Sequence, residues 1–466
     1  MSGGGHGGGG LPGLHAIEHW IHASWDNGGT AITARAIIIG MATAIVAFFV
    51  MSPAQSLRNF EFLFFISPIW IPLVLTKFAW VRWVQFRRRV FNAKQKYILL
   101  EIRMPRDTRK SPIAMETIFS TLHLAPGESN WYKKYWNGGV RPWWSFEIVS
   151  LGGRVHFFVW TREVYRRTIE TAFYSHYPGV EIVEATDYSL LTDPAHAPMK
   201  GFACEFVHTK DEDVYPIKTY VDYGLDKQPM PKPEEVTDPM AHIIETLGSI
   251  GPKEQLWLQF IIRVSKGEKY GGKVNAAGKP YTWKDEAKEQ IEKIRAASVR
   301  KQKRVDPVTG ATIETDGFPN PTKGEQELIN AIERNVSKVP FDVGIRAIYM
   351  GEGDAFHGSM PGSLGNIFKP FNSETGNGLK WTRWSIAFND YPWEDPHGHH
   401  HDHAIHSVTD FYRRRAYYHE PYIGPWIVMS SEELASIYHV PSKSVTTPTL
   451  PRIQSATGEA PSNLPV

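Results

Sequence analysis

WWSFEIVSLGGRVHFFVWT (143–161) is the stretch that decides the fold. Two runs rich in aromatic and β-branched residues, 143–151 and 154–161, flank Gly152-Gly153. Such residues favour strands, and a Gly-Gly pair between two of these runs is typical of a two-residue hairpin turn. The stretch therefore predicts a pair of adjacent antiparallel strands.

The segments on either side of this hairpin complete a known order of elements. An apolar strand is predicted at 97–105, and Ser111-Pro112 indicates a helix start, with Ser as the cap and Pro in the first turn. A second helix is predicted at 162–177 and a fourth strand at 180–187. The order β-α-β-β-α-β is that of a ferredoxin-like unit.

A second unit of related architecture follows, interrupted by a charged insertion at 266–322. The insertion has few apolar positions, which predicts a solvated helix or a coiled-coil-like arm. The fold class is therefore predicted as α+β: an N-terminal transmembrane helical hairpin followed by two ferredoxin-like units, the second with a long charged helical insertion. The strands of the second unit are expected at 200–209, 215–223, 254–265 and 341–350, and its helices at 238–250 and 323–338.

Composition narrows the class of protein. The chain has 466 residues, enough for two or three domains, and 42% of them are hydrophobic. A net charge of +2 gives no overall field that would favour nucleic acid or acidic partners. The single Cys204 excludes an internal disulfide framework and suits a reducing compartment. We interpret Cys204 as a small core residue rather than a nucleophile.

Two apolar runs near the N-terminus predict membrane spans. The run 36–57 has no charged side chain and is long enough to cross about 30 Å of hydrocarbon. The run 60–80 contains Pro68 and Pro72, which spanning helices tolerate. A single span followed by a buried or re-entrant arm is the alternative to two spans. The residues expected to face the membrane include Ile37, Ile38, Ile39, Phe48, Phe49, Phe64, Phe65 and Trp70.

Basic residues predict the orientation of these spans. The expected connecting loop holds only Arg58, whereas a basic cluster that includes Arg87, Arg88 and Arg89 follows the second run. Because loops rich in Lys and Arg stay in the cytoplasm, both termini and the soluble body are expected on the cytoplasmic side of the inner membrane. No signal peptide is visible.

The region 371–430 holds two candidate sites. His399, His400, His401 and His403 belong to a His-rich tract at 395–406 that predicts a flexible loop, in which metal binding would be adventitious. Arg413, Arg414 and Arg415 stand among aromatic residues. Such mixtures grip single-stranded nucleic acid by stacking and phosphate contact, but they also build ordinary domain interfaces, the interpretation that we favour.

The C-terminal residues 431–466 are rich in Pro and Thr and predict an extended linker to a further domain. The expected division is then complete. It comprises a Gly-rich and amphipathic N-terminus (1–31), the transmembrane hairpin with a basic juxtamembrane helix (32–95), the first unit (96–190), the second unit (191–370), the His-rich and basic/aromatic region (371–430) and the tail (431–466).

Motifs that would carry catalysis are absent from the sequence. It contains no GxxxxGK[ST] loop for phosphates, no GxSxG, no HExxH, no paired CxxC and no DxDxDG loop. We therefore expect no catalytic residues and no cofactor, although scattered residues could still assemble into an active site.

The stretch YILLEIRMPRDTRKSPIAMETIFSTLH (97–123) resembles the start of the cytoplasmic part of bacterial type IV secretion or conjugation-type DNA-translocating ATPases. Weaker similarity continues through EQLWLQFIIRV (254–264) and GNIFKPFN (365–372) to the tail. In that family the tail leads into a motor domain with phosphate-binding motifs, which this chain lacks. The resemblance implies a membrane-anchored, non-motor module that acts with a separate or missing P-loop ATPase.

Three functions follow in order of preference. The first is a non-enzymatic membrane anchor and assembly module of a DNA-translocation-like system. The second is a self-assembling membrane scaffold that needs no motor, and the third is a metal-binding membrane protein centred on the His tract. The expected partners are membrane lipids, further copies of the chain and a P-loop ATPase, with nucleic acid as an open alternative.

Overall fold

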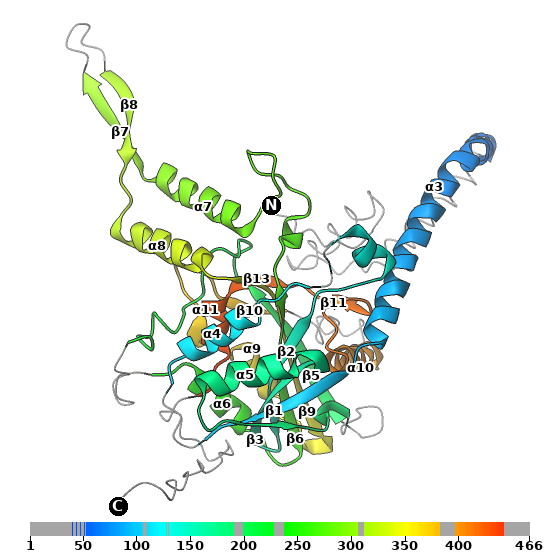
Figure 1. Ribbon diagram of the computed structural model, residues 1–466. Coiled ribbons are helices and arrows are strands. Elements are labelled where there is room, and N and C mark those ends of the chain that lie inside the picture. Colours follow the sequence, from blue (N-terminus) through cyan, green and yellow to red (C-terminus); the bar gives the residue numbers. More distant parts are fainter. Residues whose placement is uncertain are drawn as a thin grey trace, which may run out of the picture. The chain divides into compact units, whose positions relative to one another are not determined.

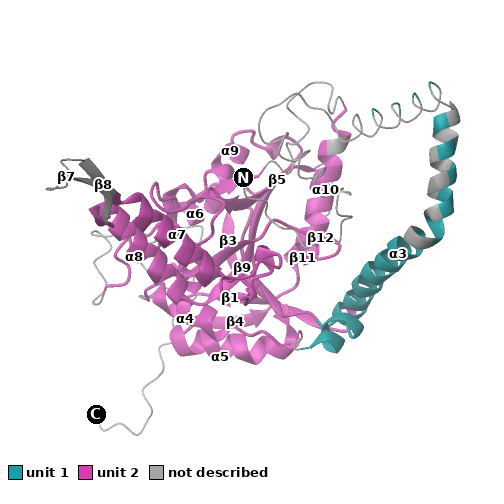
Figure 2. Cartoon of the chain, turned by 90° about the horizontal axis from the view of Figure 1, so that it is seen from above, with its two compact units in different colours: residues 1–92, 130–139 teal, residues 93–129, 140–466 magenta. Residues whose placement is uncertain are grey.

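The computed structural model describes residues 53–105, 110–126, 128, 130–190, 199–227, 237–305, 312–382 and 397–441, together with Gly40, Thr43, Ala47 and Met51. The chain forms two compact units (Figure 2). Unit 1 comprises 1–92 and 130–139, and unit 2 comprises 93–129 and 140–466.

Unit 1 is built on the helix α3 (Pro53–Ala93), which contains Pro68 and Pro72. A short π-helical turn, Tyr132–Trp136, belongs to the same unit. Arg58 lies inside α3, so the expectation that it stands in a loop between two spans is wrong. Among the described residues, no helix combines the length and the apolar character that crossing a membrane requires. The first expected span, including Ile37, Ile38, Ile39, Phe48 and Phe49, lies mostly outside the described residues.

Unit 2 is a mixed α and β structure around one large antiparallel sheet, which confirms the α+β class. Neighbouring strands follow the order β10-β5-β9-β6-β2-β3-β1-β4, and β13 pairs with β9. The hairpin predicted from 143–161 is present: Leu151 pairs with Arg154, and Gly152 and Gly153 adopt φ of +59° and +84°. The strands are β1 (Tyr97–Arg103), β2 (Trp143–Leu151), β3 (Arg154–Arg162), β4 (Glu181–Glu184), β5 (Met199–His208), β6 (Glu254–Val264), β9 (Pro340–Glu352), β10 (Leu379–Trp381) and β13 (Ile427–Ser430).

One face of this sheet carries the main hydrophobic core. Alternate strand residues such as Phe146, Phe260 and Ile345 pack there against a layer of helices (Figure 1). Because side chains alternate between faces along a strand, this leaves the residues between them for the opposite face. The helices of the core layer are α4 (Ile113–Thr121), α5 (Arg166–His176), α6 (Met240–Gly248), α9 (Met360–Gly365) and α11 (Ser431–Ile437).

The opposite face is covered by α10 (His399–Arg413) and by the segment that follows it, which includes the short strands β11 (Tyr418–His419) and β12 (Tyr422–Ile423). Ile405 of α10 packs directly over Gly201 of β5, where a Cβ atom would come within 2.9 Å of its side chain. The His-rich tract predicted as a loop is therefore helical from His399 onward. Gly398, at φ +72°, precedes the helix.

The charged insertion is larger than predicted. The helices α7 (Trp283–Ala297) and α8 (Lys323–Ser337) pack together, and the two-stranded hairpin of β7 (Val299–Val305) and β8 (Thr312–Pro319) joins them (Figure 1). Ile329 and Ile332 of α8 are buried in a small separate core with Trp283 and Ile291. The helix predicted at 323–338 is therefore confirmed as α8, but its apolar face packs in this small core, which also includes Val214 and Val428, rather than in the main core of the sheet.

Two further predictions are corrected. Residues 215–223 form turns rather than a strand, because backbone groups such as those of Thr219 and Tyr220 bond to nearby side chains instead of a ladder. Residues 431–441, expected in an extended linker, are buried throughout. Leu434 and Ile437 of α11 belong to the main core, so this part of the tail completes the fold. The rest of the tail, 442–466, lies outside the described residues.

Candidate functional site

A row of polar side chains crosses the sheet on the face that α10 covers. Glu147 on β2 pairs in register with Gln259 on β6, Gln259 with Arg346 on β9, and Arg346 with Glu205 on β5. All four residues are buried. Buried charged groups are stable only when they are paired and hydrogen-bonded, so the partners of each decide whether the row is a reactive site or an internal support.

Arg415 closes one end of this row. Its Nε lies 2.9 Å from Oε1 of Glu147 and its Nη2 lies 3.1 Å from Oε2, a bidentate ion pair in which neither side chain is exposed. Arg415 also pairs with Asp187. Burial alone raises the pKa of the Asp187 carboxyl, but the charge and hydrogen bonds of Arg415 hold it below its ordinary value.

Arg413, Arg414 and Arg415, predicted as possible nucleic-acid or interface contacts, differ in their surroundings. Arg415 is fully buried and cannot reach nucleic acid. The Nε of Arg413 donates to the carbonyl oxygen of Ser189 at 2.9 Å. Only Arg414 is exposed, and it pairs with Asp410 one turn earlier on α10.

Arg346 and Glu205 close the other end of the row. The Nε and Nη2 of Arg346 donate to Oε1 of Glu205 at 3.1 and 3.0 Å. The Tyr422 hydroxyl donates to Oε2 of Glu205 at 2.6 Å, and the rings of Tyr417 and Tyr422 lie against the guanidinium. The row therefore consists of compensated charges under a cover of aromatic rings, which suits an internal support rather than a catalytic site.

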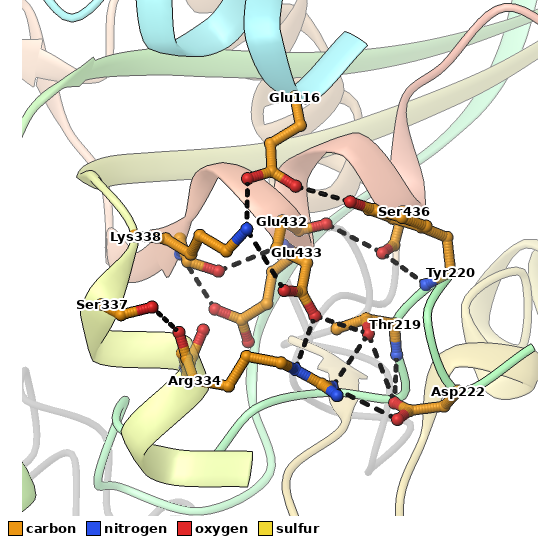
Figure 3. A network of polar contacts seen from close by, with 12 residues as sticks. Glu116, Thr219, Tyr220, Asp222, Arg334, Ser337, Lys338, Glu432, Glu433 and Ser436 are labelled. Atoms are coloured by element: carbon orange, nitrogen blue, oxygen red, sulfur yellow. Dashed lines mark hydrogen bonds and ion pairs between the residues drawn. The ribbon is translucent and has the colours of Figure 1, made fainter. Parts of the chain in front are cut away.

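A second polar network joins the insertion to the body of unit 2 (Figure 3). The Nζ of Lys338, just after α8, lies 2.8 Å from Oε1 of Glu116 on α4 and 3.8 Å from Oε2 of Glu432 on α11. Arg334 on α8 lies 3.1 Å from Oε1 of Glu432 and 3.2 Å from Asp222. Two cations of the insertion thus hold three carboxylates of the body.

The carboxyls of α11 in this network have unusual proton affinities. Burial raises the pKa of Glu432, although the charge of Arg334 opposes the shift. Burial also raises the pKa of Glu433 to about 7, against the opposing charge of His208. Glu433 accepts hydrogen bonds from the backbone amides of Ile217 and Ser430 at 3.1 and 2.9 Å. Because Glu433 is fully enclosed, we interpret its carboxyl as a support for the chain at 217 and 430.

A His–Asp pair near Glu433 is the arrangement most like a catalytic one. His208 Nδ1 lies 2.9 Å from Asp213 Oδ1, and Asp213 also pairs with Lys269. Such pairs activate hydroxyl or thiol nucleophiles in hydrolases. Here both side chains are about 2% exposed or less, and the buried Cys204 forms no described contact with them. The pair is therefore closed to a substrate, and among the described residues Nε2 of His208 has no hydrogen-bond partner that could act as a nucleophile.

The predicted metal ligands occupy the start of α10. His399 is exposed, His401 lies 3.6 Å from Asp402, and Nδ1 of His403 lies 3.3 Å from the hydroxyl of Ser407. His400 is placed in the same helix. Within the described ranges, no three His, Cys, Asp or Glu side chains come together in a way that could hold a metal ion.

Unit 1 presents an apolar and aromatic surface. Every residue from 71 to 80 of α3 is exposed, with Leu73 at 69% and Leu75 at 58%. Phe64 and Phe65 are 76% and 82% exposed, whereas for Trp70 the structure describes the helical backbone but not the side chain. In the basic cluster, Arg87 Nε donates to the carbonyl oxygen of Trp136 at 2.6 Å, Arg88 is partly buried and Arg89 is exposed.

The sequence prediction did not identify Glu147, Glu205 or Arg346. A signal existed, because each is a charged residue inside a strongly apolar strand, where a two-sided core leaves no solvent face. Their partners Asp187, Arg415 and Tyr422 come from distant segments, which no local pattern reveals.

Comparison with known proteins identifies a family. A family model described as Domain of unknown function (DUF8128) matches residues 89–452, which is most of the chain and all of the described part of unit 2. No curated protein matches. The buried polar row and the core helices described above therefore lie within the matched region, and the chain belongs to the DUF8128 family.

Proposed function

We propose that this protein is a non-enzymatic, membrane-anchored assembly module. The observation that carries the proposal is the helix α3, whose residues 71–80 are exposed on all sides although most are apolar. A mostly apolar stretch that is exposed on every side of a helix needs a lipid or protein environment. We propose that residues 36–80 attach the chain to the inner membrane. The basic residues after them support a position of unit 2 on the cytoplasmic side.

The polar sites of unit 2 favour a structural role over catalysis. The charges of Glu147, Glu205, Arg346 and Arg415 are paired and closed to solvent, and the His208–Asp213 pair is equally enclosed. Groups that no substrate can reach do not perform chemistry on one. We therefore propose a module that positions a partner rather than an enzyme.

We also infer that unit 2 contains two ferredoxin-like halves. The strand orders β4-β1-β3-β2 and β10-β5-β9-β6 support this, because each places the first and third strands of its half at the centre. The two halves meet through the antiparallel pair β2–β6. In this scheme the insertion with α7 and α8 stands between the second and third strands of the second half.

The link to DNA translocation rests on the resemblance of 97–123 to translocating ATPases. A separate P-loop ATPase is the partner that this resemblance suggests, with further copies of the chain beside it. The insertion supports a docking role, because a pair of helices ending in a β-hairpin offers a surface that the core of unit 2 does not use.

Membrane extraction tests the anchor. The full chain expressed in bacteria should remain in the membrane fraction after an alkaline carbonate wash. The variant Leu73→Glu/Leu75→Glu should be extracted more readily than the unaltered chain, because a charged side chain in a membrane segment costs up to about 2.5–3.5 kcal/mol on insertion scales. The matched control is Val164→Glu/Leu190→Glu, which alters two equally exposed apolar residues of unit 2 and should stay bound. Release of the unaltered chain would reject the anchor.

A further inference from the structure

The segment 130–139 lies between α4 and β2 in the sequence but belongs to unit 1. Aromatic contacts hold it to α3. Trp131 stacks on Trp80 with ring centroids 6.0 Å apart, and Trp136 lies 5.3 Å from Trp83. The chain returns to α3 here after building the first strand and helix of unit 2.

The backbone of the segment also fits closely against α3. Gly138 adopts φ +69°, and a Cβ atom at this position would come within 2.3 Å of the backbone of Arg87. The hydrogen bond from Arg87 to the Trp136 carbonyl lies beside this contact. A residue with no side chain is therefore needed where the two backbones meet, and the segment packs against the helix in one defined position.

The exposed surface of the segment 130–139 is aromatic and basic. Trp131 and Trp136 are 59% and 44% exposed although both contact rings of α3, and Tyr132 is 55% exposed. Lys133 is exposed and Lys134 lies over the Tyr135 ring. Trp and Tyr gather at the boundary between hydrocarbon and water, and Lys beside them attracts anionic headgroups.

We infer that 130–139 is a second membrane contact, which rests on an anionic lipid surface beside the point where α3 leaves the membrane. The inference depends on the proposed anchor role of α3. Two arguments select lipid as the occupant: the aromatic patch is continuous through Trp80 with the exposed apolar stretch 71–80, and its charge complements anionic headgroups. The contact would fix where the membrane surface lies along α3.

Site-specific fluorescent labels test this inference in vesicles. The full chain is labelled with an environment-sensitive dye at Tyr132→Cys or at Leu75→Cys and reconstituted into neutral or anionic phosphatidylglycerol-containing vesicles. The native Cys204 is fully buried and its thiol pKa is raised by that burial, so it should not react. Quenching by nitroxides placed in the headgroup region and by iodide in the water reports where each label sits.

In anionic vesicles, the label at 132 should be quenched by the lipid nitroxide and protected from iodide. Both effects should be several-fold larger than in neutral vesicles. Lys133→Glu/Lys134→Glu should abolish this preference. The charge-matched control Lys284→Glu/Lys323→Glu alters exposed lysines of unit 2 and should leave it intact.

The second label separates this inference from the anchor proposal. A label at 132 that stays accessible to iodide while the label at 75 is protected would overturn the lipid contact and leave the anchor standing. Accessibility of both labels would overturn both. Protection at 132 that is equal in neutral vesicles and unaffected by the lysine reversals would show a protein contact or an internal site, which also rejects the inference.

Discussion

Replacing Arg415 with Met tests whether the polar row supports the fold. Arg415 and Glu147 are both fully buried and joined by two hydrogen bonds of 2.9 and 3.1 Å. Removing one partner of such a pair leaves an uncompensated buried charge and costs about 3–5 kcal/mol. With an unfolding entropy of about 2.1 cal/mol/K per residue and roughly 350 folded residues, this lowers Tm by about 4–7 °C.

Thermal unfolding of the full chain in mild detergent, followed by circular dichroism, measures this loss. Arg414→Met is the matched control, because Arg414 is exposed and its pair with Asp410 is an ordinary surface contact, worth about 0.3–0.5 kcal/mol. The double variant Glu147→Gln/Arg415→Met should be less destabilised than the sum of the two single variants, because neither charge then stays unpaired. Equal Tm values for the Arg414 and Arg415 variants would refute the assigned role of the ion pair.

The remaining predictions concern pH, packing, metal binding, nucleotide hydrolysis and self-association. Burial, with the charge of Asp213, raises the pKa of Glu286 to about 7. The native state therefore binds this proton more tightly than the unfolded state does, so the stabilisation is full below pH 4.5 and is lost as pH rises through 7. Glu286→Gln should flatten the dependence of the denaturant midpoint on pH across this window. An unchanged dependence on pH would contradict the role of Glu286. Gly344→Ala should lower Tm by several degrees, because its Cβ would lie 2.4 Å from the Tyr417 ring, whereas Gly324→Ala meets open space and should not. Replacing His399, His400 and His401 with Ser should leave Tm and metal content unchanged, and stoichiometric zinc lost on mutation would reveal a site after all. Purified protein should not hydrolyse Mg-ATP, since the sequence has no phosphate-binding loop, and turnover by a preparation free of contaminating ATPase would contradict the non-enzymatic role. Mass measurement in mild detergent should show an oligomer, and a monomer at every usable concentration would exclude self-association.

The sequence by itself predicted the elements that local patterns encode. The hairpin 143–161 follows from apolar runs around Gly152-Gly153, and the structure places its turn there. The helices α4 and α5 were predicted at the correct places, because their apolar spacing depends only on neighbouring residues. The predicted cap was wrong: Pro112 is the N-cap of α4, and the Ser111 hydroxyl donates to the carbonyl oxygen of the distant Leu225. The sequence also showed that it contains none of the familiar catalytic motifs that were searched for, because such motifs have fixed spacings.

The tertiary structure alone decided which polar residues are buried and what the tail does. Arg415 was predicted as a possible nucleic-acid or interface contact, but its ion-pair partner Glu147, 268 positions earlier in the chain, could not be predicted. The tail segment 431–441 looked too polar to pack, but Glu433 caps its helix by bonding to Ser430, and Glu432 pairs with Arg334 of α8. Residues 215–223 have the composition of a strand, yet their backbone groups find partners in Asp222 and Ser436. In each case a long-range partner compensates the cost of burial, and only the folded chain brings that partner close.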